Sequence, residues 1–193
     1  MDKSISPEEK ILNATIQCIE QYGLEGTTIR RIADIADVNS AAISYYFRSK
    51  DKLVERAMEV SLIHAFDWND FPKPGECSLH ERIVSIFSRL VEGSYAFPGL
   101  TRAHFFSVFT KGEYDNPAIK KINEFLEELI KDIRAEYPGK NENEIRTALT
   151  QIASAAFLIP SLMPGVFSSI SNVDFTNTAQ LKAYIGRIVE RLL

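Results

Sequence analysis

Apolar residues recur every three or four positions along most of the chain, between short polar segments that contain proline or glycine. This spacing puts them on one face of a helix and predicts a series of amphipathic helices. The first begins at Ser6-Pro7, where a serine cap, a proline and then Glu9 form a helix-start signal, and it is expected to end near Gly23.

The later helices are delimited in the same way. Ser49 can cap a fourth helix that runs toward Trp68, and Ser78 with Glu81 forms another capping box. The remaining signals are Pro98-Gly99 as the end of that helix, Asn116-Pro117 as the start of the next, and Tyr137-Pro138-Gly139 as its end. No segment alternates like a strand for long enough to predict a sheet, so the expected fold class is all-α.

Residues 27–52 predict two short helices joined by a tight turn. In the first, Thr28 is the expected cap and an apolar stripe follows it; because Arg31 stands three residues later, no reciprocal capping box forms. In the second, Asn39 is the expected cap. The stripe of the first helix consists of Ile29, Ile32, Ala33 and Ala36.

The second short helix has one apolar face and one polar face. Ile43 and Phe47 are spaced to be buried together, and Arg48 and Lys50 follow where a sugar-phosphate backbone would pass. Small residues and hydroxyls on the opposite face allow close approach to bases, and aromatic edges can contact thymine methyls. That opposite face carries Ser40, Ala41, Ser44 and Tyr45, with Tyr46 at its margin.

These motifs resemble the DNA-binding module of the TetR family of bacterial repressors. The resemblance covers about residues 5–65 and is carried by Tyr22-Gly23, Gly26-Thr27-Thr28, Ile32-Ala33, Val38, Ile43, Tyr45-Tyr46-Phe47 and Ser49-Lys50. It implies a DNA-binding domain over 1–50 with the helix-turn-helix at about 28–47, and a helical effector-binding and dimerisation domain over 51–193. It also implies a homodimer that represses transcription until a small-molecule effector binds.

Two positions depart from the family pattern. The turn has Asp37 where glycine is usual, a change that a left-handed backbone tolerates at a small cost. Ser44 stands where the family often has a tyrosine, which puts the operator sequence in doubt. By resemblance, base contacts are expected from Arg30, Ser40, Ala41 and Ser44, and phosphate contacts from Thr28, Tyr45, Tyr46 and Lys50.

Charge gives partial support to DNA binding. Two helices joined by a turn also occur in many proteins that do not bind DNA. The whole chain carries a net charge of −4, whereas a general nucleic-acid-binding protein is usually basic. Residues 27–56, however, hold six basic residues against four acidic ones, a local charge of +2 that leaves −6 for the remainder. This charge asymmetry fits a basic DNA-binding region, residues 27–56, in an otherwise acidic chain.

Composition narrows the other functional classes. The polar start Met1-Asp2-Lys3 predicts no signal peptide, and a cytoplasmic location is expected. Cys18 is expected in the core, and Cys77 in a loop, where an unreactive thiol is favoured over a redox sensor. Neither spacing predicts a metal site or a disulfide, and no cofactor is expected.

Residues 147–173 contain no charged side chain. A membrane span is disfavoured because Pro160 and Pro164 interrupt the stretch, so no membrane partner is expected. The favoured interpretation is a helix over about 142–159, buried on one side by its own chain and on another by a partner subunit. With a final helix carrying Leu181, Ile185, Ile188 and Leu192 on one stripe, residues 142–160 and 178–193 predict a dimer interface.

The middle of the chain is rich in aromatic residues. Most of these side chains are expected to lie in the core, but some can line an apolar pocket that also holds a few polar groups. The helix from Lys50 would then link this pocket to the DNA-binding helices. The candidate ligand-binding residues are His64, Trp68, Phe87, Tyr95, His104 and Phe105.

Two other functional classes are alternatives to a DNA-binding regulator. An enzyme is disfavoured because the three histidines, His64, His80 and His104, lie apart and without a nucleophile or phosphate loop beside them, so no catalytic residue is predicted. A TetR-like ligand or lipid carrier without DNA binding is the alternative function, disfavoured by the tyrosines and basic residues around the second short helix.

Overall fold

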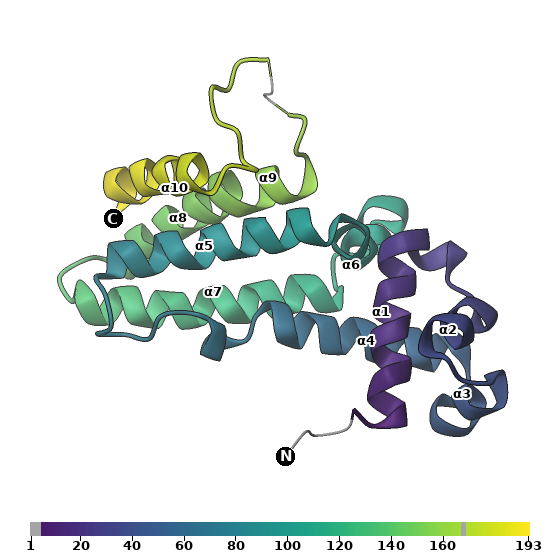
Figure 1. The fold of residues 1–193 in the computed structure, drawn as a ribbon. Coiled ribbons are helices and arrows are strands. Elements are labelled where there is room, and N and C mark those ends of the chain that lie inside the picture. The colour runs from purple at the N-terminus through teal and green to yellow at the C-terminus, as the bar shows by residue number, and fades with distance from the viewer. Residues whose placement is uncertain (1–4, 167–168) are drawn as a thin grey trace. The chain divides into compact units, whose positions relative to one another are not determined.

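The fold is entirely helical in the part of the chain that the computed structural model describes, residues 5–166 and 169–193 (Figure 1). The only β feature within these ranges is an isolated bridge between Pro74 and Cys77. The prediction of an all-α fold is confirmed. The elements are Pro7–Gly26 (α1), Ile29–Ala36 (α2), Ser40–Phe47 (α3), Lys50–Ala65 (α4), Trp68–Asp70 (η1), Leu79–Ala96 (α5), Pro98–Lys111 (α6), Pro117–Glu136 (α7), Glu142–Ala153 (α8), Ser154–Leu158 (η2), Ile159–Leu162 (α9) and Thr178–Leu192 (α10).

Most of the predicted helix starts are confirmed by their caps. The amide of Glu9 donates to Ser6 Oγ at 3.2 Å and the amide of Ser6 donates back to the Glu9 carboxylate at 2.9 Å. Ser78 and Glu81 repeat this capping box, with amide-to-oxygen distances of 3.2 and 3.0 Å. The regular helix breaks at Gly23 as predicted, because its φ of 69° and ψ of 178° are not helical, and a further short helical stretch continues α1 to Gly26.

The chain divides into two compact units. The first unit consists of Met1–His64 and Phe97–Ala118, and the second of Ala65–Ala96 and Ile119–Leu193. The first unit therefore includes α6, which begins about thirty residues beyond the motif resemblance. The predicted functional division at residue 50 stays a prediction.

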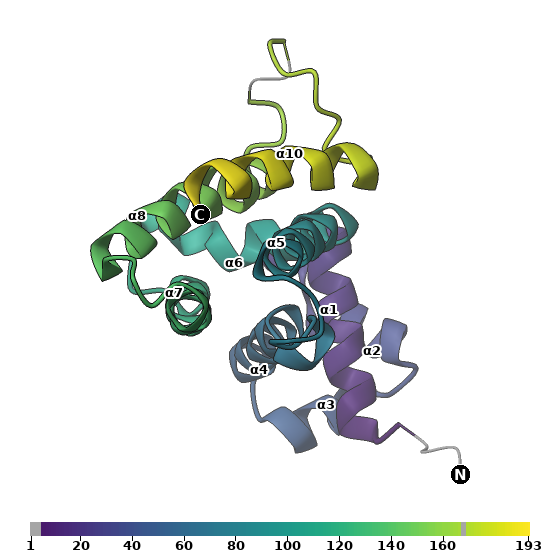
Figure 2. The same ribbon diagram turned by 90° about the vertical axis from the view of Figure 1, so that its left-hand side faces the viewer.

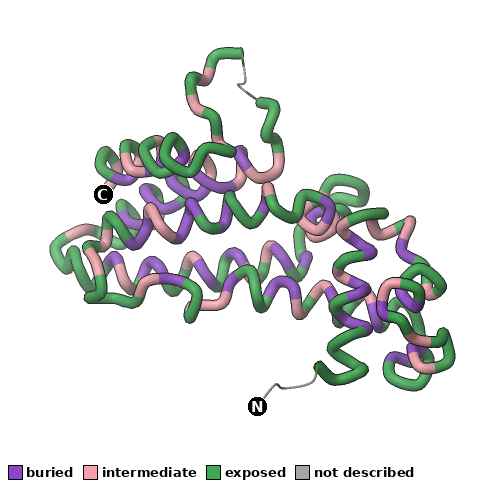
Figure 3. Tube along the Cα trace, viewed as in Figure 1, coloured by how far each residue is buried: buried purple, intermediate pink, exposed green. Residues whose placement is uncertain are grey.

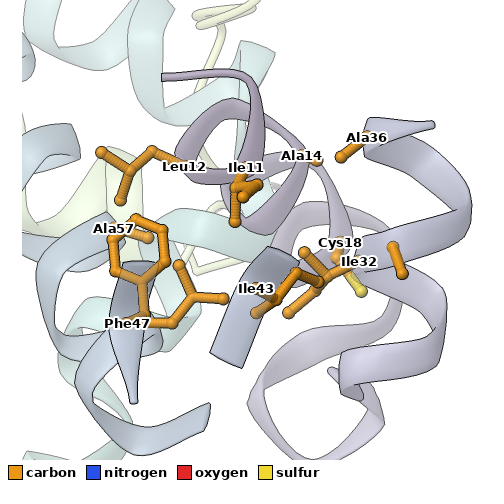
Figure 4. Packing of buried hydrophobic residues seen from close by; sticks show 11 residues of the cluster. Ile11, Leu12, Ala14, Cys18, Ile32, Ala36, Ile43, Phe47 and Ala57 are labelled. Carbon is orange, nitrogen blue, oxygen red and sulfur yellow. The ribbon is translucent and has the colours of Figure 1, made fainter. Parts of the chain in front are cut away.

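The core of the first unit joins α1, α2, α3 and α4. Figure 4 shows side chains from these four helices converging on one cluster, with Cys18 among them. Burial alternates along α1 and α2 as the helical period requires (Figure 3). The buried members of the cluster are Ile11, Leu12, Ala14, Cys18, Ile32, Ala33, Ala36, Ile43, Phe47, Leu53 and Ala57.

In the second unit, α10 lies across α5 and α8 (Figure 2). Two members of the predicted stripe of α10, Leu181 and Ile185, are buried together with Val189, whereas the other two, Ile188 and Leu192, are half-buried. Residues at i, i+4 and i+8 stay on one face of a helix, so Val189 continues the stripe, and Ile188 falls on the adjoining face with Leu192.

Helix α6 was missed by the sequence analysis. Pro98-Gly99 was expected to end a helix, and α5 does end at Ala96, but Pro98 is also the first residue of α6. A proline fits that position because the first helical residue has no intrahelical N–H bond to make. The apolar residues of α6 do not form one stripe, since Phe105 is buried and both Phe106 and Phe109 are exposed, so the helical period gave no signal.

The first part of the charge-free stretch belongs to one continuous helical segment, α8 to α9, that ends at Leu162 and contains a π turn, η2. Pro160 lies two residues after the end of this turn. Proline cannot donate the usual amide bond, and a π turn is a local way for a helix to accommodate this. The segment Glu142–Leu162 is apolar and long enough to cross a membrane, and 44% of its apolar window is buried inside the protein. Residues 167 and 168 of the stretch lie outside the described residues.

Candidate nucleic-acid interface

The turn between α2 and α3 has the geometry that the sequence predicted. Asp37 ends α2 in the left-handed conformation, with φ 53° and ψ 51°. Thr28 Oγ1 accepts from the amide of Arg31 at 3.3 Å, and Asn39 Oδ1 accepts from the amide of Ala42 at 2.8 Å, so each short helix has a capped start. The two caps and the left-handed residue fix the direction in which α3 leaves α2.

Helix α3 presents its polar face to solvent. Ile43 is fully buried and Phe47 is nearly so, and these two side chains anchor α3 to the core of the first unit. The opposite side holds the most exposed aromatic ring on the helix, Tyr45, which is 82% exposed and packs edge-on against Tyr46 with ring centroids 5.2 Å apart. Every predicted contact residue on this helix is exposed: Ser40, Ala41, Ser44, Tyr45 and Tyr46.

A cationic side chain stands at the start of α2. Lys50 Nζ donates to the carbonyl oxygen of Thr27 at 3.3 Å, which holds the ammonium beside the first turn of α2. The free amides and the dipole of a helix N-terminus favour an anion at the same place. Thr28 keeps its hydroxyl hydrogen available, because its oxygen accepts the capping bond. Thr28 and Lys50 can therefore bind one phosphate together.

The two arginines of α2 differ. Arg31 donates to the carbonyl of Gly26, and its guanidinium lies over the Tyr22 ring, 4.6 Å from the ring centroid. Arg30 is exposed. Arginine is the side chain best suited to guanine in the major groove, and Arg30 is free to extend toward a base.

Ser44 has a limited reach. Its hydroxyl donates to the carbonyl of Ser40 at 3.2 Å, one turn back on α3. A tyrosine at this position would project beyond the helix, whereas Ser44 stays against it. The small side chains of Ser40, Ala41 and Ser44 leave room for α3 to approach the floor of a groove.

The attachment of α6 to α1 was not predicted from the sequence. The Glu20 carboxylate accepts from the amides of Gly99 at 3.1 Å and Leu100 at 2.8 Å, so it caps α6 from another helix. A side chain at Gly99 would put its Cβ 2.2 Å from the carbonyl oxygen of Glu20. Gly99 is thus required for the close approach of the two helices. A glycine directly after a helix-starting proline was the available signal.

A second set of polar contacts lies on α6. His104 Nε2 lies 2.8 Å from Ser61 Oγ on α4, and the carbonyl of His104 accepts from Asn116 Nδ2 at 2.9 Å. Burial lowers the pKa of His104 from 6.5 to about 4, so the ring is neutral near pH 7. A predicted ligand residue is here part of the internal packing of the first unit.

The other predicted ligand residues have different surroundings. Trp68 stacks on Phe125 with ring centroids 4.2 Å apart, and the Arg82 guanidinium lies 5.3 Å from the Trp68 ring. Tyr95 lines an open pocket of about 300 Å³ in the second unit, where burial and the nearby Asp174 raise its pKa. His64 is exposed, whereas Phe87 and Phe105 are buried. A common effector pocket formed by these residues stays a prediction.

Over the described ranges, no three side chains of histidine, cysteine, aspartate or glutamate lie close enough to hold a metal ion. Cys18 is buried and Cys77 is partly exposed, and both are free thiols.

Known proteins match most clearly at the N-terminus. The sequence model of "Bacterial regulatory proteins, tetR family" matches residues 11–57. Among curated relatives, the probable HTH-type transcriptional regulator YttP of Bacillus subtilis is 45% identical over 51 residues, or 26% of this chain and 25% of that protein. The HTH-type transcriptional regulator BetI of Burkholderia thailandensis is 37% identical over 49 residues, 25% of each chain. The match thus spans about a quarter of these relatives.

Solved structures match the fold along nearly the whole chain. A TetR transcription regulator from Haloarcula marismortui has a TM-score of 0.65 at 19% identity, covering 96% of this chain and 95% of its own. A TetR-like transcriptional regulator from Rhodococcus sp. RHA1 has a TM-score of 0.63 at 12% identity, covering 96% and 94%. Residues 11–57, which include the exposed polar face of α3, therefore match the tetR family of bacterial regulatory proteins, and the whole chain has a fold similar to that of solved TetR-like regulators.

Proposed function

We propose that this protein is a transcriptional repressor that binds an inverted-repeat DNA operator as a homodimer and is released by a small-molecule effector. The observation that carries the proposal is the exposed face of α3, where Tyr45 and the small residues around it have no part in the core of the first unit. A surface of hydroxyls, a methyl group and aromatic edges, eight residues long, fits a major groove.

Groups able to bind phosphate lie near α3 and support the same function. Lys50 Nζ is held by the Thr27 carbonyl beside Thr28 at the start of α2, and Tyr45 and Tyr46 carry hydroxyls at the end of α3. Hydroxyls, amines and helix N-termini are the groups that position a protein on the DNA backbone, while base edges give specificity. Arg30, Ser40, Ala41 and Ser44 are the proposed base contacts.

The proposed dimer forms through α8 and α10. A groove of about 360 Å³ runs between these helices, lined by small or polar residues of α8, such as Thr147 and Ala148, and by Arg191 and Leu192 of α10. Small residues allow helices to approach closely, so a second copy of both helices would complete a four-helix arrangement. A two-fold dimer would then read two half-sites related by symmetry.

The effector and the location are the remaining parts of the proposal. Aromatic side chains in the second unit, with Tyr95 at an open pocket, fit a compound that is apolar or aromatic. Since effector and DNA would stabilise different states, each would weaken the binding of the other by the same factor. A regulator of transcription is expected in the cytoplasm.

The test is fluorescence anisotropy with a duplex selected by this protein from a random-sequence library. Wild type is compared with Tyr45→Ala and with Tyr114→Ala, a control in which an equally accessible tyrosine, 73% exposed, lies outside α2 and α3. We expect wild type and Tyr114→Ala to prefer the selected duplex over random DNA, and Tyr45→Ala to bind it more weakly. A selection that enriches no sequence would contradict the proposal and favour the carrier function.

A further inference from the structure

Arg48 has an unusual backbone conformation at the C-terminal end of α3. Its φ is 61° and its ψ is −38°, and its amide donates to the Ser44 carbonyl at 3.1 Å. The next amide, Ser49 N, donates to the Phe47 carbonyl at 2.6 Å, so the chain reverses around Arg48 alone. A tight turn of this kind at positive φ is strained for a residue with a side chain, and glycine is the usual occupant.

The residues on both sides of Arg48 explain why the chain turns here, but they do not explain why the residue in the turn is an arginine. Phe47 is buried in the core of the first unit, and Ser49 must cap α4, where its Oγ accepts from the amide of Lys52 at 3.2 Å. Between these two fixed points the chain has one residue in which to turn. Glycine would satisfy that requirement without strain, so the backbone gives no reason for a long cationic side chain here.

The side chain of Arg48 is also unusual among its cationic neighbours. Residues 27–56 contain six basic side chains, and four of these have partners within the protein: Arg31 with Gly26 and Tyr22, Lys50 with Thr27, Lys52 with Glu55, and Arg56 with Glu59. Arg30 and Arg48 are exposed, and neither side chain has an ion-pair or hydrogen-bond partner within residues 5–166 and 169–193.

We propose that Arg48 binds a DNA phosphate at the C-terminal end of α3, and that the strained turn is retained because this contact needs the guanidinium. The inference rests on the proposed DNA-binding function. Strained residues concentrate where function requires them, and a guanidinium matches the geometry of a phosphate. Arg48 would thus hold the backbone at one end of α3, and Lys50 with Thr28 would hold it at the start of α2.

A structural role for Arg48 makes the opposite prediction for stability. A cation near the last carbonyls of α3 can stabilise the helix through its dipole. If that were why arginine occurs here, removing it would lower the melting temperature. If the arginine is kept for DNA, replacing it with glycine relieves the turn and raises the melting temperature while weakening DNA binding.

The experiment compares wild type with Arg48→Gly, Arg48→Lys and the control Asp37→Gly. Asp37 is the other non-glycine residue at positive φ among the described residues, and its substitution relieves a turn without removing a cation. Thermal unfolding gives the melting temperature. Anisotropy titrations from low to high salt, on the selected duplex and on a random duplex of equal length, give the affinity and its salt dependence.

We expect Arg48→Gly to raise the melting temperature by about 2 °C, since glycine relieves the strain but has more entropy when unfolded. One lost phosphate contact lowers the slope of log affinity against log salt by about 0.9 per protomer, or about fivefold in affinity near 0.15 M salt, equally on both duplexes. Arg48→Lys should restore the slope. Asp37→Gly should raise the melting temperature and leave the slope unchanged.

Three results would overturn the inference. An unchanged salt slope in Arg48→Gly rules out the phosphate contact, and a lower melting temperature in that variant rules out the strain that the contact is proposed to maintain. No binding of wild type to either duplex removes both this inference and the proposed function. If wild type binds both duplexes equally, sequence-specific regulation fails, and the slope on the random duplex still decides the role of Arg48.

Discussion

His104 donates a hydrogen bond to Ser61 through Nε2, because Ser61 uses its only hydroxyl hydrogen on the carbonyl of Met58. The two distances are both 2.8 Å. A serine oxygen that has given its hydrogen away can only accept, so the neutral imidazole must carry its proton on Nε2. The bond ties α6 to α4 within the first unit.

The first prediction concerns pH and stability. The pKa of His104 falls from 6.5 to about 4 because the ring is buried. A histidine with a lowered pKa binds a proton more readily when unfolded, so its contribution is complete above pH 6.5 and is lost as pH falls toward 4. Over that range the loss amounts to roughly 3 kcal/mol.

The measurement is urea unfolding of wild type and His104→Gln between pH 7.5 and 4.5. Glutamine can still donate to Ser61 but does not titrate, and the acidic residues affect both proteins alike. We expect wild type to lose more stability than the variant over this range. Equal losses in the two proteins would show that His104 is not protonated differently in the folded and unfolded states.

The second prediction uses two helical glycines. Gly99→Ala would place a Cβ against the backbone of Glu20, so we expect a loss of about 1–3 kcal/mol, as for an overpacked core. Gly93 lies inside α5 with nothing within 4 Å of an added Cβ, so Gly93→Ala should gain about 0.5–1 kcal/mol from helix propensity. Chemical denaturation of both variants tests the pair, and a stabilising Gly99→Ala would contradict the close approach of α1 and α6.

The third prediction separates a buried from an exposed ion pair. Arg82 is 4% exposed, with Nη1 2.5 Å from the Asp132 carboxylate and Nε 2.7 Å from the carbonyl of Pro72. Asp132→Ala would leave the guanidinium buried without its carboxylate, at a cost of about 3 kcal/mol. The pair of Arg89 with Asp70 is half-exposed, so Asp70→Ala should cost less than about 1 kcal/mol. Similar losses in the two variants would contradict this difference.

The sequence predicts the first 65 residues better than the rest, for reasons visible in particular residues. Thr28, Asp37, Asn39 and Ser49 act through neighbours a few positions away, so their caps and turns can be read from the sequence itself. The attachment of α6 depends on Glu20, which is 79 residues from Gly99. No local pattern encodes such a contact.

The candidate functional residues also differ in whether local sequence or distant contacts determine their surroundings. The exposed face of α3 follows from the spacing of Ile43 and Phe47, which bury the other side. Residue type predicts His104 and Trp68 as ligand residues, yet in the structure His104 bonds to Ser61 of α4 and Trp68 stacks on Phe125 of α7. Residue type alone does not distinguish a side chain that binds a ligand from one that completes internal packing.

The last prediction tests the proposed dimer. Thr147 is exposed on α8 and lines the groove with α10, and its hydroxyl bonds only within α8, to the carbonyl of Asn143 at 2.8 Å. Thr147→Arg should therefore leave the protomer folded while placing a charge, and a side chain far larger than threonine, where the second copy is proposed to pack. Thr110→Arg is the matched control, because Thr110 is also exposed and makes the same kind of bond within α6.

Sedimentation velocity should show wild type and Thr110→Arg as dimers and Thr147→Arg as a monomer with unchanged helical content. A monomer has only one copy of α3. It should therefore lose the preference for DNA with two half-sites about 10 base pairs apart and still bind one half-site weakly. A dimeric Thr147→Arg would place the subunit interface elsewhere than α8 and α10. A dimer of normal size that bound only single half-sites would instead contradict the inverted-repeat operator.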